Sequence, residues 1–166
     1  MTGKPVLHVC AVAFLTLVGL AGTRAHADSP RFPAAPPAYL AECGSCHVAY
    51  PPGLLTAGDW RTTLRGLARH FGTDATLGAA EMAVIQPYLE ANAAPLGGRH
   101  GAQRQPPRLT QTPWFERKHL RKLPAAIWTD PKVKSAANCI ACHAGAESGR
   151  YGESEISVPG FPGRHW

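Results

Sequence analysis

Two Cys-x-x-Cys-His motifs constrain this chain more than any other feature of its sequence. One runs from Cys43 to His47 and the other from Cys139 to His143. Two cysteines three residues apart lie on nearly the same side of a helical turn, so their sulfurs can reach the two vinyl groups of one porphyrin and form thioethers. The following histidine then projects its imidazole toward the iron. The motifs predict two covalently bound haem c groups.

Each motif residue receives a role from this geometry. Cys43 and Cys46 are predicted to attach the first haem, with His47 as its proximal iron ligand. The second haem is predicted to have the equivalent residues Cys139, Cys142 and His143.

Four cysteines could instead form two disulfides, bind zinc or act as a thioredoxin-like redox pair. Disulfides give no reason for a histidine after each pair. Zinc motifs place their pairs roughly 15–20 residues apart, and these pairs lie much farther apart. A thioredoxin-like pair belongs in a βαβ pattern, which the sequence lacks. Haem attachment explains all six motif residues.

The first 27 residues have the pattern of a secretory signal peptide. Lys4 precedes an apolar run from Val9 to Gly22, and Ala25-His26-Ala27 provides a small-x-small cleavage site. The alternative is an uncleaved membrane anchor, but the run is shorter than the roughly 18–20 residues that cross a bilayer. We expect cleavage after residue 27, a periplasmic location and no stable membrane span in the mature chain.

The charge of the chain is only mildly positive. Its formal net charge is +6 at pH 7. No basic run with interleaved aromatic residues is present, so the composition does not indicate a nucleic-acid partner.

The mature sequence divides into two parts that each contain one motif. Residues 28–92 form a first haem unit, and residues 112–166 form a second haem unit with a C-terminal tail. Residues 93–111 between them are rich in Gly, Pro, Gln and Arg, which is typical of a linker. With no alternating strand pattern, we predict an all-α c-type cytochrome of two small haem-centred helical units packed together, with little or no strand.

Several helices can be placed within these units. Thr56 and Asp59 resemble a capping box that opens a helix from about Ala57 to His70, ended by Gly72. A second helix is predicted to start at Asp74 and to be kinked or ended early by Pro87. A third is predicted to start at Thr112-Pro113 and to run through His119. A fourth, over 135–147, is predicted to carry the second motif.

The sixth iron ligand decides whether each haem is closed or open to substrate. Methionine is scarce, because Met82 is the only one outside the predicted signal peptide. Beyond the two motif histidines, the mature chain has His70, His100, His119 and His165.

We predict His70 as the distal ligand of the first haem and His119 as that of the second. His70 could instead be a surface residue at a helix C-terminus, and His119 a solvated residue among lysines and arginines. Each histidine could also serve the other half's haem. Bis-histidine ligation implies comparatively low reduction potentials.

The residues around the motifs resemble those of the dihaem cytochrome c family over about residues 39–159. The matching stretches are Glu42 to Leu55, Trp60 to Gly72, Tyr88-Leu89 with Asn92 to Ala94, Trp114-Phe115 with His119, and Ala137 to Glu147. The resemblance implies a helical periplasmic electron carrier with two bis-histidine haems. It also implies a membrane b-type cytochrome as donor and a small monohaem oxygen-binding c-type cytochrome as acceptor.

Two other functions are compatible with two haems. A dihaem peroxidase would keep one haem open, but members of that family are much larger and no acid–base constellation lies beside either motif. The small dihaem subunit of periplasmic nitrate reductase has its motifs closer together. We therefore expect an electron-transfer protein and no enzyme.

Overall fold

The computed structural model describes residues 34–95 and 99–162. The predicted signal peptide at 1–27 and the candidate ligand His165 lie outside these residues. Over the described part, the chain is helical with short 3-10 turns and no β-strand, which confirms the all-α prediction. None of the helices there is long and apolar enough to cross a membrane.

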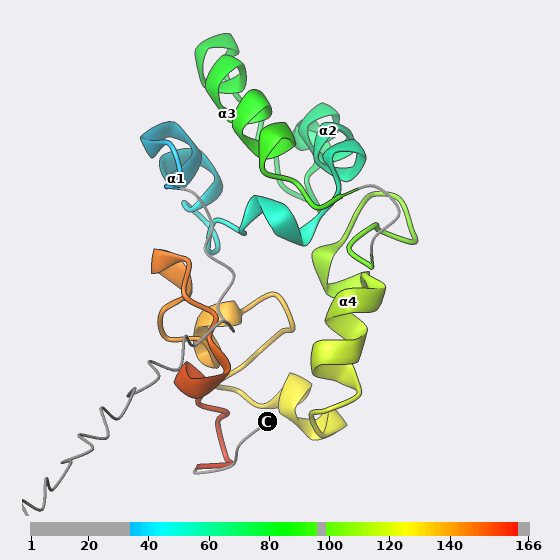
Figure 1. Ribbon diagram of the computed structural model, residues 1–166, viewed down its shortest axis with the longest axis vertical. Coiled ribbons are helices and arrows are strands. Elements are labelled where there is room, and N and C mark those ends of the chain that lie inside the picture. The colour runs from blue at the N-terminus through cyan, green and yellow to red at the C-terminus, as the bar shows by residue number, and fades with distance from the viewer. Residues whose placement is uncertain (1–33, 96–98, 163–166) are drawn as a thin grey trace, which may run out of the picture.

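Four α-helices organise the described residues (Figure 1). They are α1 (Pro37–Cys43), α2 (Ala57–Arg65), α3 (Ala79–Ala91) and α4 (Pro113–Phe115). The last continues directly into a π-helical turn, Glu116–Leu120. Helices α1, α2 and α3 lie together at one end of the molecule, and the segment after α4 winds through short turns at the other end.

Helices α1, α2 and α3 share one core, which also takes in one residue of the predicted linker, Leu109, and one beyond it, Phe115. The buried members of this core are Tyr39, Leu54, Leu55, Trp60, Leu64, Ile85, Leu89, Leu109 and Phe115. A second and smaller core contains Ile127, Val133 and Val158. Since Leu109 and Phe115 pack with the first core, the two ends of the molecule are in direct contact. The predicted domain boundaries stay a prediction.

Helix α2 begins as predicted but ends earlier. The Thr56 hydroxyl accepts a hydrogen bond from the Asp59 N–H at 3.2 Å and donates one to the Asp59 carboxylate at 2.6 Å. The helix ends at Arg65, because Gly66 favours helix poorly and the chain tightens into a 3-10 turn over Leu67–Arg69. The prediction of a helix to His70 was therefore wrong. After His70, Phe71 and Gly72 both have positive φ values, of 50° and 99°, and form a left-handed turn.

Helix α3 also differs from its predicted bounds. It begins at Ala79, because the Asp74 carboxylate accepts hydrogen bonds from the Thr76 N–H at 2.9 Å and hydroxyl at 2.6 Å and keeps the preceding turn out of the helix. The predicted start at Asp74 was wrong. Pro87 lies inside α3, which runs on to Ala91, so of the two predicted effects of Pro87 the early end is excluded.

The segments that carry the motifs are less helical than expected. The first motif lies at the end of α1, which was not predicted and in which Cys43 is the last residue. The second lies on a 3-10 turn, Cys139–Ala141, so the helix predicted over 135–147 was wrong. Lys134 has a φ of +65°, and the Asn138 side chain donates to the Val133 carbonyl at 3.0 Å. These local bonds compete with helix formation.

Candidate functional site

The first motif places His47 in the loop that follows α1. Its Nδ1 lies 2.8 Å from the Val48 carbonyl oxygen, so this nitrogen is the donor and Nε2 is left free. The ring of Tyr50 stacks on the imidazole with centroids 4.6 Å apart and planes 16° apart. These two contacts fix the orientation of the imidazole.

His70 lies opposite His47, at the end of the 3-10 turn that follows α2. Reciprocal backbone hydrogen bonds between His70 and Thr73, at 2.8 and 3.1 Å, close the loop that carries it. The centroids of the two imidazoles are 6.4 Å apart. Burial, followed by the neighbouring His47 and Arg108, lowers the pKa of His70. The neutral imidazole that results is the form that binds metals.

The second motif holds His143 by its backbone. The His143 N–H donates to the Cys139 carbonyl at 2.8 Å, and an isolated bridge joins His143 to Ile156. Its Nδ1 is buried and has no hydrogen-bond partner. Burial lowers the pKa of His143, which favours the neutral ring.

His119 faces His143 from the π-helical turn after α4. The Thr112 hydroxyl opens α4 by accepting from the Phe115 N–H at 3.2 Å, which confirms the predicted cap. The His119 ring stacks on Phe115 with centroids 4.1 Å apart, and its Nδ1 lies 3.3 Å from the Phe115 carbonyl oxygen. Burial and the proximity of His143 lower the pKa of His119 to about 4. The centroids of His119 and His143 are 6.1 Å apart.

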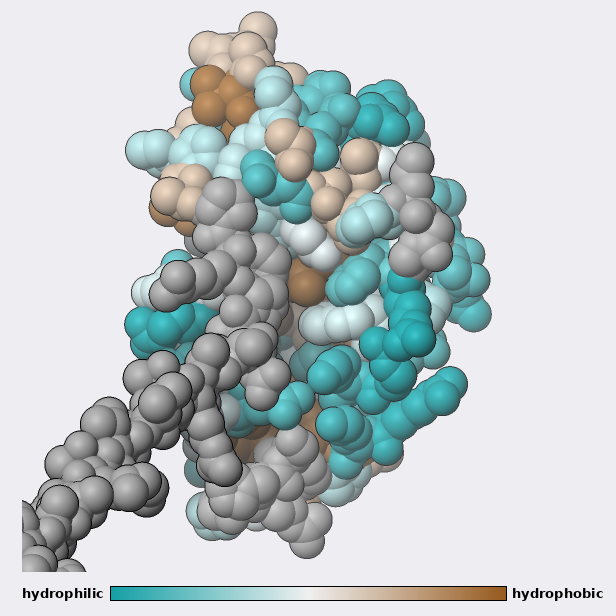
Figure 2. All heavy atoms as spheres, viewed as in Figure 1, coloured by the Kyte–Doolittle hydropathy of each residue, from teal (hydrophilic) through white to brown (hydrophobic). Residues whose placement is uncertain are grey.

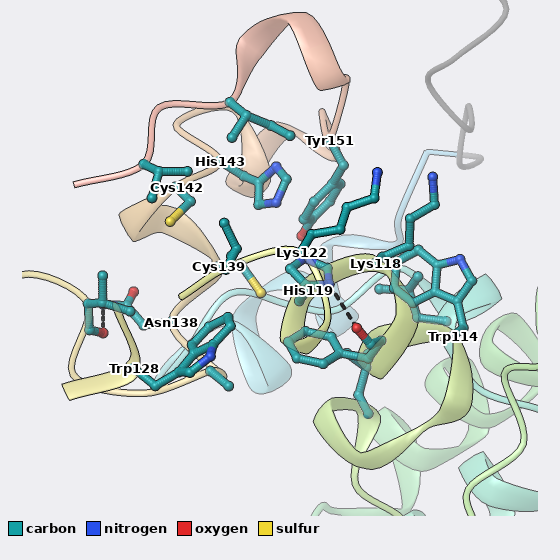
Figure 3. A pocket seen from close by; sticks show the side chains of 18 of the residues that line it. Trp114, Lys118, His119, Lys122, Trp128, Asn138, Cys139, Cys142, His143 and Tyr151 are labelled. Atoms are coloured by element: carbon teal, nitrogen blue, oxygen red, sulfur yellow. Dashed lines mark hydrogen bonds between the residues drawn. The ribbon is translucent and has the colours of Figure 1, made fainter. Parts of the chain in front are cut away.

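A cavity of about 330 Å³ lies between α4 and the second motif (Figure 3). His119 and His143 point into it from opposite sides, and Cys139 and Cys142 border it. Its further lining includes the apolar or aromatic residues Leu54, Leu109, Trp114, Phe115, Leu123, Trp128, Val133, Tyr151, Ile156 and Val158. An apolar, aromatic cavity with two imidazoles across it suits a porphyrin.

The spacing of the imidazoles tests whether an iron fits between them. Two imidazoles bound to opposite faces of one iron, each through a metal–nitrogen bond of roughly 2.0–2.1 Å, have centroids about 6.3 Å apart. The observed separations are 6.4 Å for His47 and His70 and 6.1 Å for His119 and His143. Both pairs therefore fit an axially ligated haem, and each pair comes from one half of the sequence.

The other uses of the cysteines fit less well. The four motif cysteines are free, without a disulfide between them. Burial raises the pKa of Cys43 and of Cys139 to about 11, whereas a redox-active pair needs a lowered thiol pKa. Within residues 34–95 and 99–162, no three His, Cys, Asp or Glu side chains are grouped to hold a metal ion by themselves.

Three residues of these surroundings were not singled out from the sequence as site residues. Tyr50 stacks on His47, Tyr151 packs on His143 with centroids 5.3 Å apart, and His100 stacks on Trp114 at 5.1 Å. The tyrosine at position 50 falls in the stretch that resembles the family, three residues after the motif. No comparable signal marks Tyr151. His100 contacts neither motif histidine, so it is not placed as a ligand.

Comparison with known proteins places these features in one family. The family described as dihaem cytochrome c matches residues 39–151. No match was found among curated proteins.

Solved structures agree with this family. A dihaem cytochrome c from Shewanella baltica is 40% identical, with a TM-score of 0.64, and the match covers 75% of this chain and 94% of that one. A dihaem cytochrome c from Rhodobacter sphaeroides is 38% identical, with a TM-score of 0.64, over 73% of this chain and 100% of that one. The chain therefore belongs to the dihaem cytochrome c family, which implies two covalently bound haem c groups.

Proposed function

We propose that this protein is a periplasmic electron carrier in which both haems are closed by two histidines. The observation that carries the proposal is the pair of facing imidazoles at each motif, at separations that fit one iron. The first haem would lie between His47 and His70 and the second between His119 and His143. Each haem supplies a one-electron redox centre.

The protein's own residues hold these centres and keep them closed. Cys43 and Cys46 would attach the first porphyrin, and Cys139 and Cys142 the second. A histidine held on each side of the iron would leave no position for a substrate, which favours electron transfer over substrate conversion. The fixed loop around His70 and the π-helical turn around His119 limit the rearrangement that accompanies a change in charge.

The proposed partners follow from the family resemblance. A membrane b-type cytochrome would supply electrons, and a small monohaem oxygen-binding c-type cytochrome would accept them. Lys118, Arg121 and Lys122 are exposed beside His119. These basic side chains support the proposal that a partner docks at the second haem through an acidic surface. Figure 2 shows hydrophilic residues over the side of the molecule on which α4 lies. Such charges raise the rate of encounter with an acidic protein.

The periplasmic location rests on the signal-like pattern at 1–27. Its test is the intact mass of the protein isolated from the periplasm. The expected species begins at Asp28 and carries two haems without free thiols. A species that retains residues 1–27 would contradict the proposed cleavage, and absence of the protein from the periplasmic fraction would contradict the proposed export.

Carbon monoxide tests whether the haems are closed. The ferrous protein is titrated with carbon monoxide and followed by its Soret band. No spectral change is expected at either haem, because no coordination position is free. Stoichiometric binding at one haem would overturn the bis-histidine proposal for that haem and favour an enzyme.

A further inference from the structure

Tyr50 contacts the first motif through its aromatic ring and the segment before the second motif through its hydroxyl. On one side, its ring lies nearly parallel to the imidazole of His47, with centroids 4.6 Å apart. It is not part of the Cys-x-x-Cys-His motif, and haem attachment gives no reason for a tyrosine at this position. The contact nevertheless places an aromatic ring directly against the proximal ligand proposed for the first haem.

On the other side, the Tyr50 hydroxyl reaches the second motif. It donates a hydrogen bond to the carbonyl oxygen of Ala137 at 3.1 Å, across 87 positions of sequence. The same carbonyl accepts the N–H of Cys139, also at 3.1 Å. Ala137 is two residues before Cys139, so the tyrosine is bonded to the segment that leads into the second thioether position.

The position of Tyr50 is itself fixed. The hydroxyl of Tyr39, a residue only 2% exposed, donates to the Tyr50 carbonyl at 2.5 Å. The two following residues, Pro51 and Pro52, are buried and have restricted backbones. The ring and the hydroxyl are held in one arrangement.

We infer that Tyr50 is a positioning residue that couples the two haem sites and provides the route by which an electron passes between them. The inference rests on the proposed function, because it takes His47 as an iron ligand. Tunnelling decays more slowly along bonds and hydrogen bonds than across gaps. From His47 the route crosses one ring stack and one hydrogen bond and then follows the backbone from Ala137 to Cys139.

The electron balance of this transfer is simple. One electron leaves a ferrous haem, which becomes ferric, and reduces the other haem from ferric to ferrous. Tyr50 is neither oxidised nor deprotonated, so no further reactant is needed.

The test compares two substitutions of Tyr50 in the protein that carries both haems. Tyr50→Phe removes the hydrogen bond to Ala137 and keeps the ring stack, whereas Tyr50→Leu removes both. Tyr88→Phe is the matched control, because Tyr88 is a half-buried tyrosine of α3 whose ring packs on Tyr39 and not on a motif histidine. A soluble photoexcited reductant gives each protein one electron in a light flash. Electron equilibration between the two haems, whose potentials are measured beforehand, is then followed optically.

The expected result separates the two contacts. Tyr50→Phe slows equilibration several-fold but leaves the ferric electron paramagnetic resonance signal of the first haem as in the unsubstituted protein. Tyr50→Leu slows it at least as much and also shifts the g values of that signal, because the His47 ring is released. Tyr88→Phe changes neither. Equilibration in Tyr50→Phe at the unsubstituted rate, or equal slowing in Tyr88→Phe, would overturn the inference.

Failure of the inference can be told apart from failure of the proposed function. If the unsubstituted protein already shows a high-spin haem that binds carbon monoxide, the bis-histidine proposal fails. If both haems are low-spin and the Tyr50 variants equilibrate at the same rate as the Tyr88→Phe control, the inference alone fails.

Discussion

The two distal histidine candidates are held in place by different local means. His119 lies in a helical turn, where the Phe115 ring and carbonyl fix its imidazole. Since a carbonyl only accepts, Nδ1 of His119 is the donor and Nε2 is free to face His143. His70 instead lies in a loop closed by backbone hydrogen bonds to Thr73. Each is fixed without needing a side chain from the other half of the sequence.

Replacement of His70 tests its assignment to one haem. In His70→Ala, we expect the first haem to become five-coordinate and to bind one equivalent of carbon monoxide per chain, while the second stays closed. Titration of the ferrous protein measures this. His100→Ala is the control, since His100 stacks on Trp114 and faces no motif histidine. If His70→Ala binds no carbon monoxide, or if His100→Ala does, the assignment is wrong.

At the scale of elements, the short helix α4 matters because it carries His119 into position. The helix is opened by Thr112, which has no exposed surface and whose hydroxyl both donates to the Leu109 carbonyl and accepts from the Phe115 N–H. An α-helix of only one turn has little stability of its own. The Thr112 cap therefore contributes a larger share of the stability of α4 than a cap contributes to a long helix.

Removal of this cap should lower the stability of the protein. We expect Thr112→Ala to lower the free energy of unfolding by about 0.5–2 kcal/mol, the usual cost of losing such a cap. Thr129→Ala is the control, because Thr129 is exposed and its hydroxyl donates only to the Ala126 carbonyl. Denaturant titration measures both. Equal stability losses in the two variants would contradict a special role for the α4 cap.

How well the elements could be predicted depended on whether local signals decided the structure. The caps at Thr56 and Thr112 were predicted because a cap is set by a few neighbouring residues. The helix predicted over 135–147 failed because side-chain and backbone bonds around Asn138 favour turns. Helix α2 ends before the predicted His70 because Gly66 favours helix poorly and a 3-10 turn follows it.

For the candidate site, the motif chemistry could be proposed from spacing alone, and the sequence also pointed to His70 and His119. The geometric pairing of each with its own motif needed the structure, because it depends on how loops far apart in sequence meet. The bond from Tyr50 to Ala137 is of the same kind, since nothing in either segment marks the other as its partner.

At the scale of the whole molecule, the two ends differ in how much core they have without haem. The first core joins α1, α2 and α3 with Leu109 and Phe115. The second contains only Ile127, Val133 and Val158 as buried members, around the cavity of about 330 Å³. A core this small is marginal by itself. The second haem should therefore supply much of the apolar contact that holds its end of the molecule.

Loss of the second haem should loosen that end alone. In a variant with Cys139→Ala and Cys142→Ala, we expect faster amide hydrogen exchange over 125–160 and little change in α2 and α3. Mass spectrometry of exchanged peptides measures this. Ile140→Ala serves as the control, because it alters an exposed residue of the same motif and leaves both cysteines. Exchange that rises equally throughout the chain would contradict the account.

The central claim is that two pairs of histidines close two haems, and the electron paramagnetic resonance spectrum of the ferric protein tests it most directly. The account predicts two low-spin bis-imidazole signals that together integrate to two spins per chain, with no high-spin component. A high-spin signal, or a low-spin signal that integrates to a single spin, would contradict it.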